Sequence, residues 1–178
     1  MTPFPLGLDS PGKRVTTSTR MNRDAARLMA IVAEHLFRGF ARYAKRDVTG
    51  DGIDETFCNL LVQDVCEAMG VTVPRNTRAN ALVQWLASPA AAAFDWEVLS
   101  LATEAEADAA HVAQRMADEG QLVLAGWVNP SGPGHIAVVI PSLDEPGVWI
   151  AQAGRTNFTR GTLQTGFGGR AVTYFAHP

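Results

Sequence analysis

The sequence predicts an α+β fold, and two observations support this prediction. In the first half, apolar residues recur at the three- and four-residue spacing of amphipathic helices. After Gly120 the chain changes to short β-branched or aromatic segments separated by turn residues, as in consecutive strands. Helices followed by consecutive strands indicate N-terminal helices on one side of an antiparallel sheet, here over about residues 121–176.

Length and composition limit the kind of protein. The 178 residues suffice for one well-buried domain, which we expect over 21–178. Residues 1–20 carry three prolines and little periodicity, which predicts an extended or poorly ordered arm. A net charge of -3 leaves no basic excess for a nucleic-acid partner. We find neither a secretory signal pattern nor an apolar stretch long enough for a membrane anchor.

The individual elements follow from the local pattern. Residues 22–45 are predicted to form a helix, because Leu28, Val32, Leu36 and Phe40 recur on one face. A second helix over 57–69 is followed by Gly70, which suits a helix C-terminus. Two further helices are expected, at about 77–86 and from Thr103 to just before Gly120. The expected strands are the segments QLVLAGWV, HIAVVIP, GVWIAQ and AVTYFA.

The second helix contains both cysteines. Cys58 lies in its first turn, where unpaired backbone N–H groups favour a thiolate over a thiol. Cys66 falls on the buried stripe, where a cysteine is usually an inert core residue. On one helix the two side chains are about 12 Å apart, beyond disulfide reach. Cys58 is therefore the predicted nucleophile.

A catalytic thiolate needs a base, and the sequence contains four histidines. His135 follows the turn NPSGPG and opens the apolar strand HIAVVI, so its ring can face a cleft at the edge of the sheet. His35 and His111 lie within predicted helices, and His177 is next to the chain end, where fraying is common. His135 is therefore the predicted base.

The residues that would support this pair are less sharply indicated. Gln152 ends the next strand and would orient the imidazole if the two strands are antiparallel, while Asn157 is the competing choice. Asn59 follows the nucleophile and offers an amide for the oxyanion, although an exposed polar residue is the simpler interpretation. Trp127, just before NPSGPG, is the tryptophan that we expect in a substrate cleft.

The segments FCNLLVQDV, GHIAVVIP and VWIAQAGRTN, in this order, resemble papain-like peptidoglycan hydrolases of the NlpC and CHAP type, over roughly residues 47–178. The resemblance implies a papain-like core and a cysteine peptidase or amidase that cleaves the peptide part of peptidoglycan at the cell wall, without a cofactor for catalysis. It implies Cys58 as nucleophile, His135 as general base and Gln152 as orienting residue. Many members of the family have His, Glu or Asn at this third position.

The acidic loop DVTGDGIDE, residues 47–55, leads into the cysteine helix. Its oxygen atoms fall at the alternating spacing that wraps a calcium ion, from the side chains of Asp47, Thr49, Asp51 and Glu55 and the carbonyl of Ile53. The alternative is a solvated turn in which the glycines supply left-handed conformations. The loop therefore predicts either a structural calcium site, which would stiffen the segment before Cys58, or a turn without an ion.

Three classes of function remain open from the sequence. The first is a cysteine hydrolase that acts on peptidoglycan peptides. In the second, the same Cys–His pair carries out acyl transfer or deamidation on another substrate, because the acyl-enzyme step is shared. The third is a non-catalytic binding domain stabilised by calcium. The sequence gives neither the oligomeric state nor the route by which a hydrolase would reach the wall.

Overall fold

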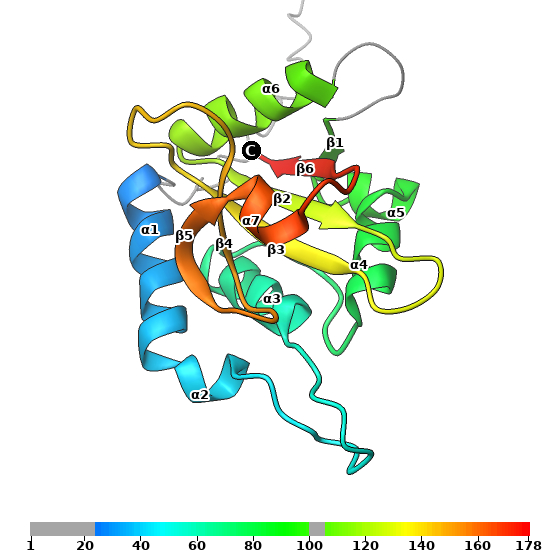
Figure 1. Cartoon of the computed structure of the whole chain (residues 1–178). Helices are drawn as coiled ribbons and strands as arrows, with labels where there is room; N and C mark the ends of the chain where they lie inside the picture. Colours follow the sequence, from blue (N-terminus) through cyan, green and yellow to red (C-terminus); the bar gives the residue numbers. More distant parts are fainter. Residues whose placement is uncertain (1–23, 100–105) are drawn as a thin grey trace, which may run out of the picture.

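The computed structural model describes residues 24–99 and 106–178, and it confirms the α+β class. Figure 1 shows helices packed on both sides of a twisted sheet. The predicted arm over residues 1–20 and the predicted helix start at Thr103 lie outside the described residues.

The sheet has six strands in the order β1-β6-β2-β3-β4-β5, and every neighbouring pair is antiparallel. The four predicted strands are present, and β1 and β5 join them at the two edges. Neither edge strand was predicted, because β1 is too short to show a period and β5 has the mixed sequence FTRGT. The strands are β1 Glu97–Val98, β2 Leu122–Trp127, β3 His135–Ile140, β4 Trp149–Gln152, β5 Phe158–Thr162 and β6 Thr173–His177.

Helices cover both faces of the sheet, so the prediction that they cover one side was wrong. Helices α1 (Ala25–Ala33), α3 (Cys58–Ala68) and α4 (Ala79–Leu86) contribute to the core on one face. Helix α6 (Glu106–Asp118) and the short α7 (Leu163–Phe167) contribute to a second core on the other face. The central strands β2 and β3 are buried almost throughout, which requires cover on both sides.

The first predicted helix is interrupted by a π-helical turn, η1 (Glu34–Arg38), between α1 and the short α2 (Phe40–Tyr43). Leu28, Val32 and Leu36 are buried as predicted, but Phe40 is 56% exposed. A π-turn accommodates an extra residue and so rotates the following side chains away from the original stripe. Tyr43 is fully buried and takes the place in the core that was expected for Phe40.

Helix α3 occupies the predicted position and ends at Ala68, and Gly70, two residues later, has a φ of 69°, the left-handed conformation expected after a helix. The predicted stripe is buried, but so are the polar residues Gln63 and Asp64 on the same helix. The α1–α2 segment and the chain after α3 cover the side of α3 that faces away from the sheet. Two further helices, α4 and α5 (Pro89–Ala92), follow along the chain.

Asp64 is the centre of a polar cluster that joins α2 to α3. Its carboxylate accepts hydrogen bonds from the Tyr43 hydroxyl at 2.7 Å, from Arg42 Nε at 2.8 Å and from Arg75 Nη2 at 3.2 Å. Burial alone would raise the pKa of Asp64, but the bonds from Arg42 and Tyr43 outweigh it, and the net pKa is lowered. The cluster therefore stabilises the folded state with Asp64 charged.

We expect Asp64→Ala to lower the free energy of unfolding at pH 7 by about 2–3 kcal/mol, because Arg42, Arg75 and the buried Tyr43 hydroxyl lose their bonds to the carboxylate. Since the folded-state pKa of Asp64 is lowered, its stabilisation is complete above the ordinary value of about 3.9 and is lost as the pH falls below it. Urea unfolding at pH 7 and pH 3 measures both effects. The control is Asp54→Ala, which removes a half-exposed ion pair with Lys45; an equal loss there would contradict the prediction.

Candidate active site

Cys58 is the first residue of α3, and its side chain is only 2% exposed. The sulfur contacts the backbone N–H groups of Ile136 and Asn59 and its own N–H. Ile136 is the second residue of β3, and β4 pairs with β3 only from Val138 to Ile140. The start of β3 is therefore left without β4 as a neighbour, and the end of α3 that carries Cys58 meets it there.

The structure corrects the expected ionisation of Cys58. Burial raises the pKa of the thiol above its ordinary value, although the N–H groups of Ile136, Asn59 and Cys58 act in the opposite direction. The prediction considered the helix N-terminus alone, which favours a thiolate. Because the sulfur is enclosed by core residues, desolvation of the charged form is the larger effect.

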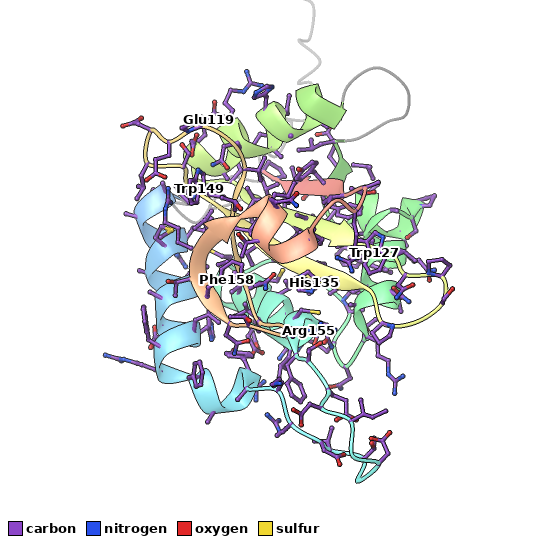
Figure 2. The ribbon with its side chains drawn as sticks, viewed as in Figure 1. Glu119, Trp127, His135, Trp149, Arg155 and Phe158 are labelled. Atoms are coloured by element: carbon purple, nitrogen blue, oxygen red, sulfur yellow. The ribbon has the colours of Figure 1, made fainter. Side chains whose placement is uncertain are left out.

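His135 opens β3 as predicted, with its ring held between a polar and an aromatic neighbour. Its Nε2 lies 2.7 Å from Gln152 Oε1 at the end of β4, and its ring lies 4.8 Å, centroid to centroid, from that of Phe167 on α7. Figure 2 shows His135 at the start of its strand below α7. Burial lowers the pKa of His135, the Gln152 bond raises it, and the charge of Arg170 lowers it further.

The orientation of Gln152 assigns the tautomer of His135. The Gln152 amide donates from Nε2 to the Thr156 carbonyl at 3.0 Å, so its Oε1 is the atom that faces the imidazole. An oxygen acceptor at 2.7 Å requires that Nε2 of His135 carry the proton. The lone pair of Nδ1 is then available to take a proton from a neighbouring group.

Of the two predicted orienting residues, the structure brings Gln152 to His135 and directs Asn157 elsewhere. Asn157 Oδ1 accepts the N–H of Gly154 at 2.9 Å, and its Nδ2 donates to the Tyr43 carbonyl at 3.0 Å. Gln152 reaches the ring because β3 and β4 are antiparallel, as the prediction required. Whether this contact serves catalysis stays a prediction.

Cys58 and His135 are neighbours through the backbone. The thiol contacts the N–H of Ile136, the residue directly after His135. Among the described contacts, no hydrogen bond joins the sulfur to the imidazole. The raised thiol pKa and the lowered imidazole pKa both favour the neutral forms of the two groups at pH 7. Such a pair can transfer a proton when the sulfur attacks an electrophile.

The two other predicted site residues have different surroundings. Asn59 Nδ2 donates to the Thr77 carbonyl at 2.9 Å, so this amide connects α3 to the loop before α4. Trp127 is directly opposite His135 in the β2–β3 register and is half-buried, with the Arg170 guanidinium 4.7 Å from the centroid of its ring. Figure 2 labels Trp127 and His135 on these adjacent strands. Trp127 therefore lies next to the candidate base.

Sequence reasoning missed the residues around α7. Phe167 packs on the His135 ring, and Arg170 acts on its pKa. The segment was interpreted as a glycine-rich connection, yet a Cβ on Gly166 would lie 2.5 Å from Ile150 Cδ1 and 2.6 Å from Gln152 Oε1. Gly166, the first glycine of GFGG, was thus an available signal, because it marks a close approach of the backbone to Gln152, the partner of His135.

The acidic loop is closed by its own backbone. Asp47 accepts the N–H groups of Gly50 and Gly52 at 2.6 and 2.8 Å, which lower its pKa. Asp51 accepts the N–H of Ile53, and Glu55 accepts that of Val48; Thr49 is exposed. Within residues 24–99 and 106–178, no group of three or more His, Cys, Asp or Glu side chains is placed to hold a metal. The calcium site stays a prediction, and no step below depends on it.

An open groove of about 700 Å³ lies between α6 and the β3–β4 connection. It is lined by residues that include His111, Asp118, Ser142 and Glu145, and none of the predicted site residues borders it. Asp118 accepts the backbone N–H and the hydroxyl of Ser142, so this carboxylate already has partners that connect α6 to the end of β3. The groove is separate from the Cys58 and His135 site.

Arg170→Gln is expected to raise the pKa of His135, because the Arg170 charge disfavours the imidazolium. The imidazole would then stay protonated to a higher pH, and the acidic limb of any His135-dependent rate would move upward. A ¹H–¹⁵N NMR titration of the imidazole measures this shift. Arg155→Gln is the control, since Arg155 is an exposed cation on the loop after β4 that does not contribute to the His135 pKa. Equal shifts in both variants would contradict the assignment.

Comparison with known protein-family models gives no match for this chain, and comparison with curated proteins gives no significant match. Within the described part of the chain, every helix is too short or too polar to cross a lipid bilayer. The functional argument therefore depends on the geometry of the site.

Proposed function

We propose that this protein is a cysteine hydrolase in which Cys58 attacks an amide carbonyl and His135 transfers the protons. The observation that carries the proposal is the arrangement around β3: the Cys58 sulfur contacts the N–H that follows His135, and the far nitrogen of the imidazole is held by Gln152. A nucleophile, a base and an orienting group from α3, β3 and β4 thus lie near the start of β3 and the end of β4. Thiol-dependent acyl transfer uses groups of these three kinds.

In the proposed reaction, Nδ1 of His135 takes the proton of Cys58 as the sulfur attacks the carbonyl carbon. The tetrahedral intermediate then collapses, the carbon–nitrogen bond breaks, and the imidazolium gives its proton to the leaving amine. His135 then takes a proton from water as the water attacks the thioester, the carbon–sulfur bond breaks and releases the acid, and the imidazolium returns its proton to the sulfur, which restores the thiol. Gln152 holds the ring with Nδ1 towards this chemistry throughout.

The neutral resting state has a consequence for the energetics. Because both groups are neutral before reaction, the charge separates only when the substrate is attacked, and the backbone N–H groups at the start of α3 then act on the sulfur and the developing oxyanion. At 2% exposure the thiol is covered, so substrate entry requires a local movement around Cys58. We expect slow alkylation of Cys58 by iodoacetamide when substrate is absent.

We further propose that the fold has a papain-like core and that the substrate is an amide bond in the peptide part of peptidoglycan. Support comes from the resemblance of the FCNLLVQDV, GHIAVVIP and VWIAQAGRTN segments to the NlpC and CHAP hydrolases. The order of a cysteine helix, a histidine strand and a strand that ends in a polar residue is the same as in that group.

Digestion of isolated sacculi tests this function. Purified protein is expected to release muropeptides with newly formed amino and carboxyl ends, identified by mass spectrometry, and Cys58→Ala protein is expected to release none. If the wild-type protein forms a thioester or transfers an acyl group to an added amine but leaves sacculi intact, the peptidoglycan assignment is wrong and the acyltransferase or deamidase class gains support. If no acyl-enzyme forms with any amide tested, the hydrolase proposal fails.

A further inference from the structure

Tyr43, at the end of α2, makes contacts towards both halves of the candidate site. Its hydroxyl donates to Asp64 on α3 at 2.7 Å, and this helix begins with Cys58. Its backbone carbonyl accepts a hydrogen bond from Asn157 Nδ2 at 3.0 Å, 114 residues away in sequence. The Tyr43 side chain is fully buried, so its bond to Asp64 is shielded from competition with water, while the bond from Asn157 is partly buried.

Asn157 continues this connection towards His135. Its Oδ1 accepts the N–H of Gly154 at 2.9 Å, which holds the loop after β4 in a tight turn. A Cβ on Gly154 would lie 3.3 Å from His135 Cε1, so the Gly154 backbone lies against the imidazole ring. The Thr156 carbonyl in the same loop accepts the Gln152 amide. The loop therefore supports the His135–Gln152 pair directly.

We propose that Tyr43 and Asn157 are positioning residues that form a clasp, through which the α1–α2 segment sets the cysteine helix relative to the His135–Gln152 pair. The Tyr43 hydroxyl is bonded to Asp64 on the cysteine helix. The Tyr43 carbonyl is bonded to Asn157, which holds the loop beside His135. This deepens the proposed hydrolase function and rests on it for its catalytic meaning. It assigns a role to residues 25–43, for which the sequence indicated none.

Loss of the Asn157 bonds and loss of the Tyr43 hydroxyl, the two arms of the clasp, are expected to have different consequences. Loss of the Asn157 bonds frees the 153–157 loop, which removes the anchor of Gln152 and lets water reach the imidazole. Loss of the Tyr43 hydroxyl leaves that loop in place and removes the bonds of this hydroxyl to Asp64 on α3 and to His35 Nδ1, which lies 3.2 Å away. Misplacement of a reacting group by about 1 Å costs on the order of 100-fold in rate. We therefore expect either change to lower kcat, with KM nearly unchanged.

The experiment compares Asn157→Ala and Tyr43→Phe with the wild-type protein and with Gln84→Ala, a control at an exposed glutamine on α4, outside the site. Hydrolysis of a peptide isolated from sacculi gives kcat and KM. An NMR titration of the His135 ring gives its pKa, and the His135→Gln variant identifies the His135 signals. Burial is the main cause of the lowered His135 pKa; the Gln152 bond acts in the opposite direction, and the charge of the Arg170 guanidinium lowers the pKa further.

Asn157→Ala is expected to lower kcat about 10- to 100-fold and to raise the His135 pKa towards its ordinary value, because the ring becomes more hydrated. Tyr43→Phe is expected to lower kcat without moving that pKa, and Gln84→Ala to change neither. A variant that merely unfolds in part would lose amplitude and leave the pKa of the folded fraction in place. The titration therefore separates positioning from loss of folded protein.

Two results would overturn the clasp: an Asn157→Ala protein with the wild-type His135 pKa, or a Tyr43→Phe protein whose His135 pKa moves as far as that of Asn157→Ala. The second result would show that both changes loosen the whole site in the same way, and not that each bond has its own effect. The titration needs no substrate, so it also separates this inference from the proposed function. If the wild-type protein hydrolyses nothing while Asn157→Ala still shifts the pKa, the hydrolase proposal fails and the physical connection stands.

Discussion

Cys58→Ala is expected to abolish hydrolysis, with a loss of at least about 10³-fold in kcat, because no other group in the proposed mechanism can form the thioester. The fold should persist, since the change removes a single buried sulfur atom from the first turn of α3. Release of muropeptides from sacculi measures the activity. Circular dichroism and the melting temperature verify that the variant is folded.

Cys66→Ala is the matched control for this prediction. Cys66 lies on the same helix, is fully buried and, like Cys58, forms no disulfide. We expect a modest loss of stability of about 1 kcal/mol from the small cavity, and turnover like that of the wild type. A Cys66→Ala protein that is folded but inactive, or an active Cys58→Ala protein, would mean that Cys58 is the wrong nucleophile.

His135→Ala is the second change with a large expected effect. Without the imidazole, proton transfer to and from Cys58 and the leaving amine loses its carrier, and rates should fall about 10²- to 10⁴-fold. In the wild type, the pKa of His135 lies below its ordinary value of about 6.5, so the neutral base persists into mildly acidic solution. Activity should therefore be retained as the pH falls to the ordinary histidine value of about 6.5 and should decline only at lower pH.

The pH–rate profile and a control histidine test this prediction. His111 is an exposed residue on α6 that borders the separate groove, so His111→Ala should leave both the rate and the profile unchanged. An acidic limb above the ordinary histidine pKa would contradict the burial effect that we assign to His135. Full activity of a folded His135→Ala protein would exclude it as the base.

Local pattern identified the elements on which the site is built. The helix that begins at Cys58, the strand that begins at His135 and the antiparallel strand that ends at Gln152 were all predicted, because each has a clear apolar period next to turn residues or a helix boundary. The α+β class followed from the same signals. The proximity of His135 and Gln152 was also expected, since antiparallel pairing of neighbouring strands fixes which ends meet.

Other features depended on contacts between distant segments. The π-turn that exposes Phe40 and buries Tyr43 leaves no period in the local sequence. Helix α6 has an alanine stripe that suits close packing, but its sequence does not say which face of the sheet it covers. Of Gln152 and Asn157, only Gln152 contacts His135, and Asn157 is bonded instead to the Tyr43 carbonyl, which is more than one hundred residues away in the sequence.

The sequence by itself determined which residues begin and end α3, β3 and β4, and thereby which side chains stand where the start of α3, the start of β3 and the end of β4 meet. Only the tertiary structure decided the charge state of the Cys58 and His135 pair. Ionisation depends on how much water each group keeps, and that is set by packing across the whole fold. A helix N-terminus favours a thiolate wherever it occurs in a sequence, but the surrounding core determines whether the charge can form.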